Sequence, residues 1–244
     1  MANIITFSAH EEFVKSSITD KPVPIKINIP EWFKKLKHTR ENQTVKGCVP
    51  FLETLTTGYL LKVPQDMEYN FGTFDDKGNP SMAFKNSLLD GATKPLYNLN
   101  QGVEGQAHPP RQLEGSPAVG KQHNRPFLKI LNPWRIKTPP GYSCLFVPPL
   151  NNHDYPWSII PGIVDTDNFN QEINFPCVVD VDKIKNKDKT FIIEKGTPYV
   201  QIIPFKKESW KMNIEKDKKS TILLWPLKLL HSYKNLIWNK ISWN

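Results

Sequence analysis

The sequence predicts a mainly β protein: a distorted barrel of short strands with an N-terminal arm and a C-terminal helix. Beyond residue 127, runs of β-branched and aromatic residues recur about every ten residues, each bounded by proline, glycine, asparagine or aspartate. The chain has 22 prolines against 12 glycines, a balance that disfavours long helices and suits short strands between rigid turns. The predicted strands are 127–131, 143–147, 157–164, 172–179, 190–193 and 199–204, and the alternation at 210–214 suggests a last one.

The composition is that of a globular chain that can bury a core. Hydrophobic residues make up 39% of the 244 residues, so wholesale disorder is not expected. No run of about 18 uncharged apolar residues occurs, and we therefore expect no membrane-spanning helix. The first residues include acids and lack a long apolar core, so a secretory signal is not expected either.

The charge of the chain is basic, with a formal net charge of +8. A basic balance permits contact with nucleic acid, nucleotides or anionic membranes. The lysines are mostly scattered along the sequence, and scattered lysines equally describe a solubilising surface. The composition leaves both interpretations open.

Three regions follow one another along the chain. Residues 1–45 are expected to form an extended arm with a short helix around Trp32, which fastens the arm to the body or to a neighbouring subunit. Residues 46–215 form the β-rich domain, whose irregular loop 101–125 is too long for an ordinary connection. Residues 216–244 form a basic, aromatic helix that docks a partner, lies on a membrane surface or packs on its own domain.

The sequence predicts no metal site and no cofactor. The three cysteines, Cys48, Cys144 and Cys177, match no zinc motif and no disulfide framework, and the six histidines are dispersed. Such free cysteines are typical of a reducing, cytoplasmic setting. No arrangement of a nucleophile with a base can be argued from the spacing.

The segment 132–141, NPWRIKTPPG, gathers unusual residues. On a strand, Arg135 and Lys137 lie on one face and Ile136 on the other. The two basic side chains predict a contact with an anion or a nucleotide, because a guanidinium is a planar donor to phosphate. The alternative is a rigid strand between prolines whose apolar face is buried, and the sequence does not decide between the two.

Two further segments, 161–167 (PGIVDTD) and 193–203 (IEKGTPYVQII), resemble motifs of the dUTPase and dCTP deaminase family. The resemblance implies a β-clip fold that assembles as a threefold ring. It also implies that Asp165 orients the attacking water, that Asp167 is the second acid of the substrate hairpin, and that Gln201 binds phosphates. More weakly, the segments at 55–61 and 139–143 are similar to other family motifs.

The sequence departs from the motifs that make those proteins enzymes. Residues 138–141 read TPPG where the family has an arginine and a serine, and Asn168 stands where a tyrosine is expected. A lysine-rich stretch, 206–219, replaces the glycine-rich flap that closes over phosphates. Catalysis with a metal-held triphosphate needs these parts. The departures therefore favour a protein without catalytic activity.

A second resemblance covers roughly residues 20–240. The segments 108–112 (HPPRQ), 132–146 and 204–210 (PFKKESW) are similar to a family without an assigned activity that many bacteriophages carry. This resemblance implies a viral origin. A viral protein of this kind works in the cytoplasm of the infected host or in the virion.

Together these observations predict a non-enzymatic viral β-clip protein that acts in structural assembly or in binding a viral or host protein. We expect a homo-oligomer, with a trimer implied by the family. The alternative is a nucleotide-binding protein or a divergent nucleotide hydrolase, with Asp165 as the catalytic residue and Mg²⁺ as the cofactor. The candidate ligand-binding residues are Arg135, Lys137, Asp165, Asp167 and Gln201.

Overall fold

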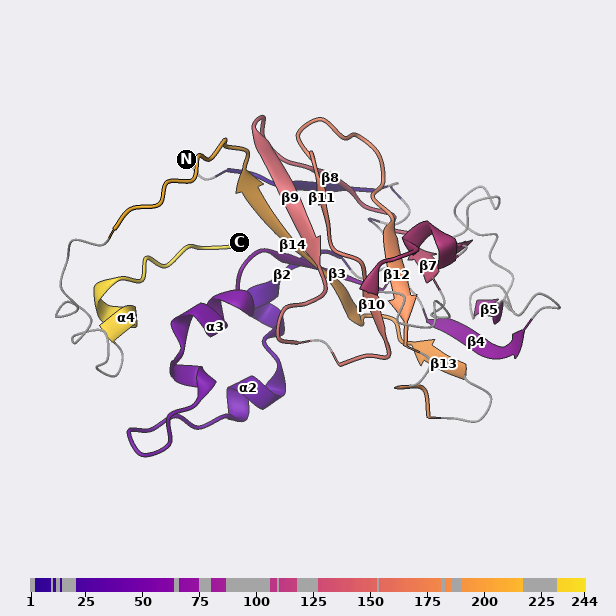
Figure 1. Cartoon of the computed structure of the whole chain (residues 1–244), viewed down its shortest axis with the longest axis horizontal. Helices are drawn as coiled ribbons and strands as arrows, with labels where there is room; N and C mark the ends of the chain where they lie inside the picture. The colour runs from indigo at the N-terminus through magenta and orange to yellow at the C-terminus, as the bar shows by residue number, and fades with distance from the viewer. Residues whose placement is uncertain are drawn as a thin grey trace.

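The structure is a computed structural model of the chain, drawn in Figure 1. It describes residues 3–9, 11, 14, 21–63, 66–74, 80–86, 106–108, 110–117, 127–152, 154–180, 183–185, 190–216 and 232–244. The predictions for most of loop 101–125 and for the first part of region 216–244 lie outside the described residues.

A five-stranded antiparallel sheet forms the centre of the described fold. Its long strand β14 pairs on one side with β9 and on the other with β3, so residues from three distant parts of the sequence meet on one sheet (Figure 1). The strands in spatial order are β11 (Gly162–Val164), β9 (Tyr142–Val147), β14 (Pro198–Lys206), β3 (Tyr59–Lys62) and β2 (Val23–Pro24).

Three smaller antiparallel sheets accompany the central one. The first contains β10 (Trp157–Ile159), β12 (Phe175–Val179), β7 (Phe127–Ile130) and β6 (Gln106–His108) in that order. The second contains β13 (Thr190–Ile193), β4 (Met67–Phe74) and β5 (Pro80–Asn86). The third pairs β1 (Thr6–Ser8) of the N-terminal arm with β8 (Arg135–Lys137).

Aromatic side chains join the central sheet to the four-stranded sheet. The ring of Phe175 on β12 lies 5.4 Å from that of Phe146 on β9 and 5.7 Å from that of Tyr199 on β14, measured between centroids. All three side chains are buried. Burial also raises the pKa of Tyr199 well above the ordinary range of a phenol. These rings mark the core between the two sheets, where apolar burial stabilises the fold.

The prediction of a mainly β fold of short strands is confirmed. The predicted strand 157–164 is wrong as one unit, because the structure divides it between β10 and β11, which belong to different sheets. The break falls at Pro161, which has no backbone N–H to give to a ladder. The segment 210–214, for which a last strand was suggested, forms no strand in the structure.

The described helices are short. The predicted helix of the N-terminal arm is present as α2, which follows Pro30, has Glu31 in its first turn and has two lysines in its last, an order that complements the helix dipole. Phe33 of α2 stacks on Phe51 of α3 with ring centroids 5.9 Å apart. The helical elements are η1 (Ile25–Asn28), α2 (Glu31–Lys35), η2 (Val45–Gly47), α3 (Val49–Thr54), η4 (Pro110–Leu113) and α4 (Ser232–Leu236).

The described end of the chain packs against the N-terminal half. The indole Nε1 of Trp238 donates a 2.9 Å hydrogen bond to Oε1 of Glu53, and the rings of Trp243 and Tyr59 meet edge to face at 6.0 Å. Helix α4 is five residues long, and residues 239–244 have no regular secondary structure, so the described helix is shorter than the sequence predicts. No helix in the described part of the chain is long and apolar enough to cross a membrane.

Candidate functional site

The acidic turn after β11 is fastened to the connection between β8 and β9. The amides of Asn168 and Phe169 donate to the carbonyl of Asp165 at 3.0 and 2.8 Å, which closes the turn. At its centre, the buried hydroxyl of Thr166 lies 2.7 Å from that of Thr138. Because these contacts join the turn to β8 and β9, the positions of Asp165 and Asp167 are fixed by the fold.

Both carboxylate oxygens of Asp167 accept hydrogen bonds within the protein. Lys207 Nζ donates to Oδ1 at 2.9 Å, and the Gly141 amide donates to Oδ2 at 2.9 Å. Only 6% of the side chain is exposed. The hydrogen bond from Lys207, followed by that from Gly141, holds the pKa of Asp167 below its ordinary value. Asp167 therefore holds a turn together and has little surface left for a ligand.

Asp165 is the more accessible acid of the pair. Its side chain is 65% exposed. Its Oδ1 accepts a 2.6 Å hydrogen bond from the hydroxyl of Ser143 and lies 3.6 Å from Lys207 Nζ. A carboxylate that is exposed and held in this way can accept a proton from a bound molecule, as a general base must.

The two predicted cations of β8 lie on the exposed side of the strand, as the alternation predicts, and Ile136 between them is buried. Arg135 Nε donates to Oε1 of Glu172 at 2.8 Å. Lys137 Nζ donates to the backbone carbonyl of Asp167 at 2.8 Å, which brings it to the acidic turn. The structure thus brings Lys137 together with Asp165 and Asp167, while Arg135 forms an ion pair with Glu172.

Gln201 lies apart from the acidic turn. The side chain is buried on β14, and its Nε2 donates to the carbonyls of Thr54 at 3.0 Å and Thr57 at 2.8 Å. Its Oε1 accepts from the amide of Leu150 at 2.9 Å. These bonds tie the end of α3 and the loop after β9 to the central sheet. A phosphate could reach this amide only after these bonds had broken, so binding by Gln201 stays a prediction.

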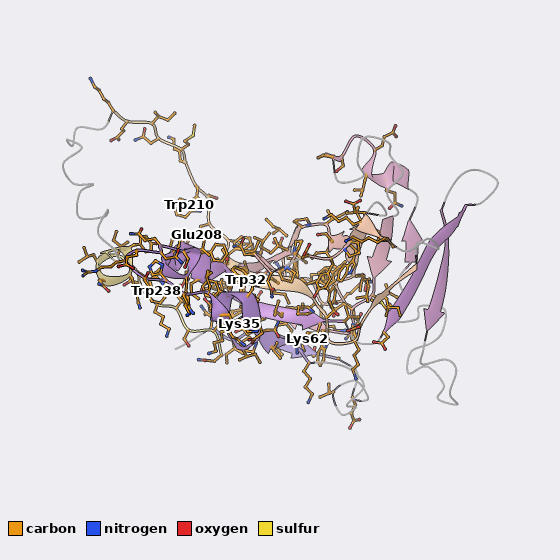
Figure 2. All side chains as sticks on the ribbon, turned by 90° about the horizontal axis from the view of Figure 1, so that it is seen from below. Trp32, Lys35, Lys62, Glu208, Trp210 and Trp238 are labelled. Carbon is orange, nitrogen blue, oxygen red and sulfur yellow. The ribbon has the colours of Figure 1, made fainter. Side chains whose placement is uncertain are left out.

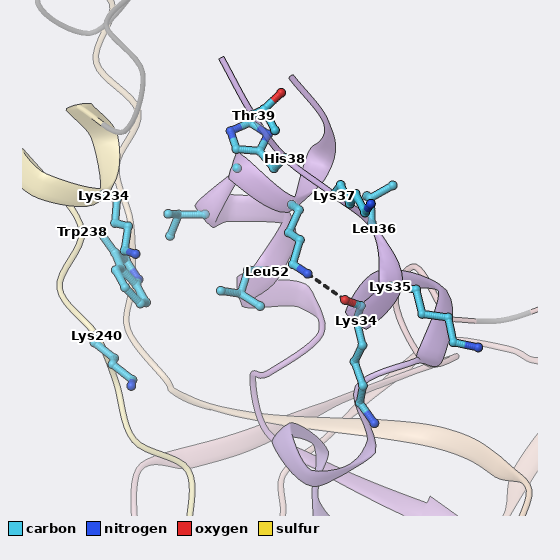
Figure 3. A pocket seen from close by; sticks show the side chains of 13 residues that line it. Lys34, Lys35, Leu36, Lys37, His38, Thr39, Leu52, Lys234, Trp238 and Lys240 are labelled. Atoms are coloured by element: carbon cyan, nitrogen blue, oxygen red, sulfur yellow. Dashed lines mark hydrogen bonds between the residues drawn. The ribbon is translucent and has the colours of Figure 1, made fainter. Parts of the chain in front are cut away.

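A second candidate site is a cavity of about 740 Å³ between the α2–α3 region and the described end of the chain (Figure 3). Six lysines line it, from both sides. The lining residues are Lys34, Lys35, Leu36, Lys37, His38, Thr39, Lys46, Gly47, Val49, Leu52, Lys234, Trp238 and Lys240. This cavity is not predicted by the sequence, although the run KKLK at 34–37 is a local signal for one of its walls.

Local contacts shape the first wall of the cavity. The Thr44 amide donates to Nδ1 of His38 at 2.9 Å, which fixes the imidazole ring. Gly47 packs on that ring so closely that a Cβ atom at this position would lie 2.3 Å from it. Lys46 Nζ donates to the carbonyl of Lys34 at the end of α2, at 2.7 Å. The loop between α2 and α3 is thereby held against α2.

A third feature is the segment that follows β14. Residues 207–216 are exposed throughout, and Figure 2 shows Trp210 on a stretch of chain that leads away from the body. The exposed fractions of Trp210, Met212 and Ile214 are 89%, 83% and 83%. These residues alternate with Lys211 and Asn213, the pattern of a strand with one apolar face.

The described residues contain no cluster of three or more histidine, cysteine, aspartate or glutamate side chains that could hold a metal ion. Among the described residues, the two acids of the turn lie beside the ammonium group of Lys207 and form no cluster with further carboxylates. Their immediate surroundings therefore supply a cation from the protein itself.

No protein-family model matches the sequence, and no curated protein matches it. Solved structures to which the chain is similar include dUTPases, among them several from bacteriophages. The native dUTPase of EIAV is 10% identical, with a TM-score of 0.35, over 89% of this chain and all of that one. A mutant dUTPase of Staphylococcus bacteriophage 80alpha with dUpNHpp is 9% identical, with a TM-score of 0.38, over 90% of this chain and 91% of that one.

A mutant dUTPase from phage phi11 of S. aureus, described as coordinating a structural Mg(II) ion, is 8% identical, with a TM-score of 0.37, over 89% of this chain and 98% of that one. At these identities and TM-scores, the function has to be inferred from the chain's own residues.

Proposed function

We propose that this protein is a non-enzymatic assembly protein that binds further copies of itself through residues 207–216, the C-terminal arm. The observation that carries the proposal is the exposed apolar row formed by Trp210, Met212 and Ile214. In keeping with the resemblance to a phage-borne family, such an assembly would work in the virion or in the cytoplasm of an infected host.

Burial of the three apolar side chains of the C-terminal arm against a partner is energetically favourable. Burying one large apolar side chain stabilises a complex by about 1.5–3 kcal/mol, so the three together offer about 5–9 kcal/mol before the entropic costs of association. The backbone of the arm is also available. The backbone amide of Lys207 donates to the carbonyl of Gly141 at 2.7 Å, but residues 208–216 make no backbone-to-backbone hydrogen bond within the described part of the chain. An extended segment of this kind is suited to pairing with the edge of a sheet.

A second copy of the chain supplies such an edge. The central sheet ends at β11, whose Ile163 is 64% exposed. An extended donor and an edge that has no strand partner in the described part of the chain lie at different places on one chain, so they form a heterologous contact. Such contacts close into rings when the rotation between copies permits. This geometry is compatible with the threefold ring that the family resemblance implies.

The test is the mass of the full chain in solution by light scattering. We expect a defined multiple of 28.1 kDa for the natural sequence and a monomer for the variant Trp210→Ser/Met212→Ser/Ile214→Ser. The matched control Lys211→Ser/Asn213→Ser changes the other face of the same arm and should keep the oligomer. A natural chain that stays monomeric at about 100 µM, a concentration well above the Kd expected for a specific oligomer, would overturn the proposal.

Asp165 favours a second candidate function, nucleotide hydrolysis. Its exposed carboxylate and its hydrogen bond from Ser143 are the observations in its favour. The test is turnover of dUTP and dCTP with Mg²⁺, using Asp165→Asn as the inactive comparison. We expect no turnover by either protein. Hydrolysis that disappears in Asp165→Asn would replace the non-enzymatic interpretation.

A further inference from the structure

The cavity described above has two walls with different origins. One wall is the loop from α2 to α3, which carries Lys34, Lys35, Lys37 and Lys46. The other is the end of the chain from α4 onwards, where Lys234 and Lys240 stand on either side of Trp238 (Figure 3). Lysines from segments at opposite ends of the sequence therefore line the same cavity.

The charge in this cavity is only partly neutralised. Lys34 pairs with Glu31 at 2.6 Å, and Lys46 donates to a backbone carbonyl. Among the described residues, Lys35, Lys37, Lys234 and Lys240 form no ion pair, and no carboxylate is among the lining residues. Like charges around one space repel one another, and an anion that enters it relieves that repulsion.

The cavity also presents an aromatic ring in a fixed position. The hydrogen bond from Trp238 Nε1 to Glu53 anchors one edge of the indole, at 2.9 Å. Leu36, Val49 and Leu52 add apolar surface to the lining. A ring anchored in this way is a platform on which a nucleobase can stack at small entropic cost.

The arrangement of the lysines suits a chain of phosphates better than a single phosphate group. The lining has no arginine fork, and its one glycine, Gly47, packs on His38, so no glycine-rich loop cradles a phosphate there. The ammonium groups come instead from two walls around the open space. Dispersed lysines beside an aromatic platform are the combination that binds single strands without sequence preference.

We propose that this cavity binds single-stranded nucleic acid, with successive phosphates near Lys35, Lys37, Lys234 and Lys240 and one base stacked on Trp238. A cavity of about 740 Å³ lies in the size range that holds a nucleotide-sized group. The site is separate from the C-terminal arm, so binding does not depend on the assembly proposed above. The arm variant Trp210→Ser/Met212→Ser/Ile214→Ser should accordingly bind the strand as the natural chain does.

The first test follows the affinity for a fluorescent oligothymidylate of about ten nucleotides by anisotropy at several salt concentrations. The logarithm of the binding constant should fall linearly with the logarithm of salt, by about 0.7 for each phosphate neutralised. Lys35→Ala/Lys234→Ala removes one lysine from each wall and should make the slope shallower by about 1.4. The control Lys183→Ala/Lys185→Ala removes two exposed lysines outside the cavity and should leave the slope unchanged.

The second test addresses the stacked base. Trp238→Ala should weaken binding by about tenfold or more, whereas Trp238→Phe, which retains a ring, should keep most of the affinity. Circular dichroism and thermal unfolding establish that each variant is folded. The proposal is overturned if the cavity variants bind with the natural salt slope, or if a folded Trp238→Ala binds as tightly as the natural chain. Equal affinity for a polyglutamate peptide or for dTMP would also overturn it.

Discussion

The amide of Gln201 allows a direct test of whether this residue holds the fold or binds phosphate. It makes three hydrogen bonds to backbone groups, two through Nε2 and one through Oε1, and it is fully buried. The change Gln201→Leu keeps the approximate volume and removes all three bonds. The carbonyls of Thr54 and Thr57 and the amide of Leu150 then lose their partner.

The expected magnitude follows from these groups. A buried backbone group that loses its only partner costs about 1–3 kcal/mol, and partial access to water near α3 reduces the sum. We therefore expect Gln201→Leu to lower the free energy of unfolding by about 3–6 kcal/mol. For a domain with a total stability of about 5–15 kcal/mol, this loss is severe.

Urea unfolding followed by tryptophan fluorescence measures the effect as a shift in the midpoint, with the slope checked for two-state behaviour. Gln171→Leu is the matched control, because Gln171 is exposed and the same change there should stay within about 0.5 kcal/mol. The structural role would be refuted by a Gln201→Leu variant of natural stability. Such a variant that had also lost nucleotide binding would establish the phosphate role that the family resemblance implies.

Three further outcomes are expected. With a thiol reagent at pH 8, Cys48 should react in the native protein, while Cys144, whose pKa is raised to about 11 by burial, and the buried Cys177 should react only after unfolding. The pKa of Asp167 is lowered in the folded state, so its carboxylate contributes stability that is present above the unfolded pKa of about 3.9 and is lost as the pH falls through the lower folded value. The variant Asp167→Asn lacks this contribution. Its urea midpoint should therefore drop less between pH 6 and pH 3 than that of the natural chain. Gly58→Ala should lower the melting temperature by several degrees, since the φ of +84° alone costs an L-residue about 1–2 kcal/mol and the new Cβ would lie 2.0 Å from a carbonyl oxygen of β14.

Strands could be predicted where local sequence decides them. The predicted strand 190–193 coincides with β13, and 127–131 differs from β7 by one residue, because β-branched and aromatic runs between turn residues have few alternatives to an extended conformation. The division of 157–164 could not be predicted in the same way. Which sheet each half joins depends on β9 and β12, and these partners are set by the tertiary fold.

The same distinction applies to the candidate sites. The turn with Asp165 and Asp167 was visible in the sequence because its residues are neighbours. The ion pair between Lys207 and Asp167 could not be predicted, because Lys207 follows β14, which is brought to the turn only by its pairing with β9. The basic cavity could not be predicted from the sequence because its two walls come from opposite ends of the chain. Lysines that are scattered in the sequence are gathered there by folding.

The net charge of +8 is therefore distributed in a way that bears on function. Around the acidic turn, Lys207 donates to the carboxylate of Asp167 and Lys137 to its backbone carbonyl, so both ammonium groups have partners within the fold. In the cavity, four lysines keep no acidic partner among the described residues. A chain that used the turn to bind triphosphates would need free cations beside Asp165, whereas Lys137 and Lys207 at this turn both donate to groups of the protein. The acidic turn is thus suited to holding strands together, and the site proposed above for binding a polyanion is the cavity.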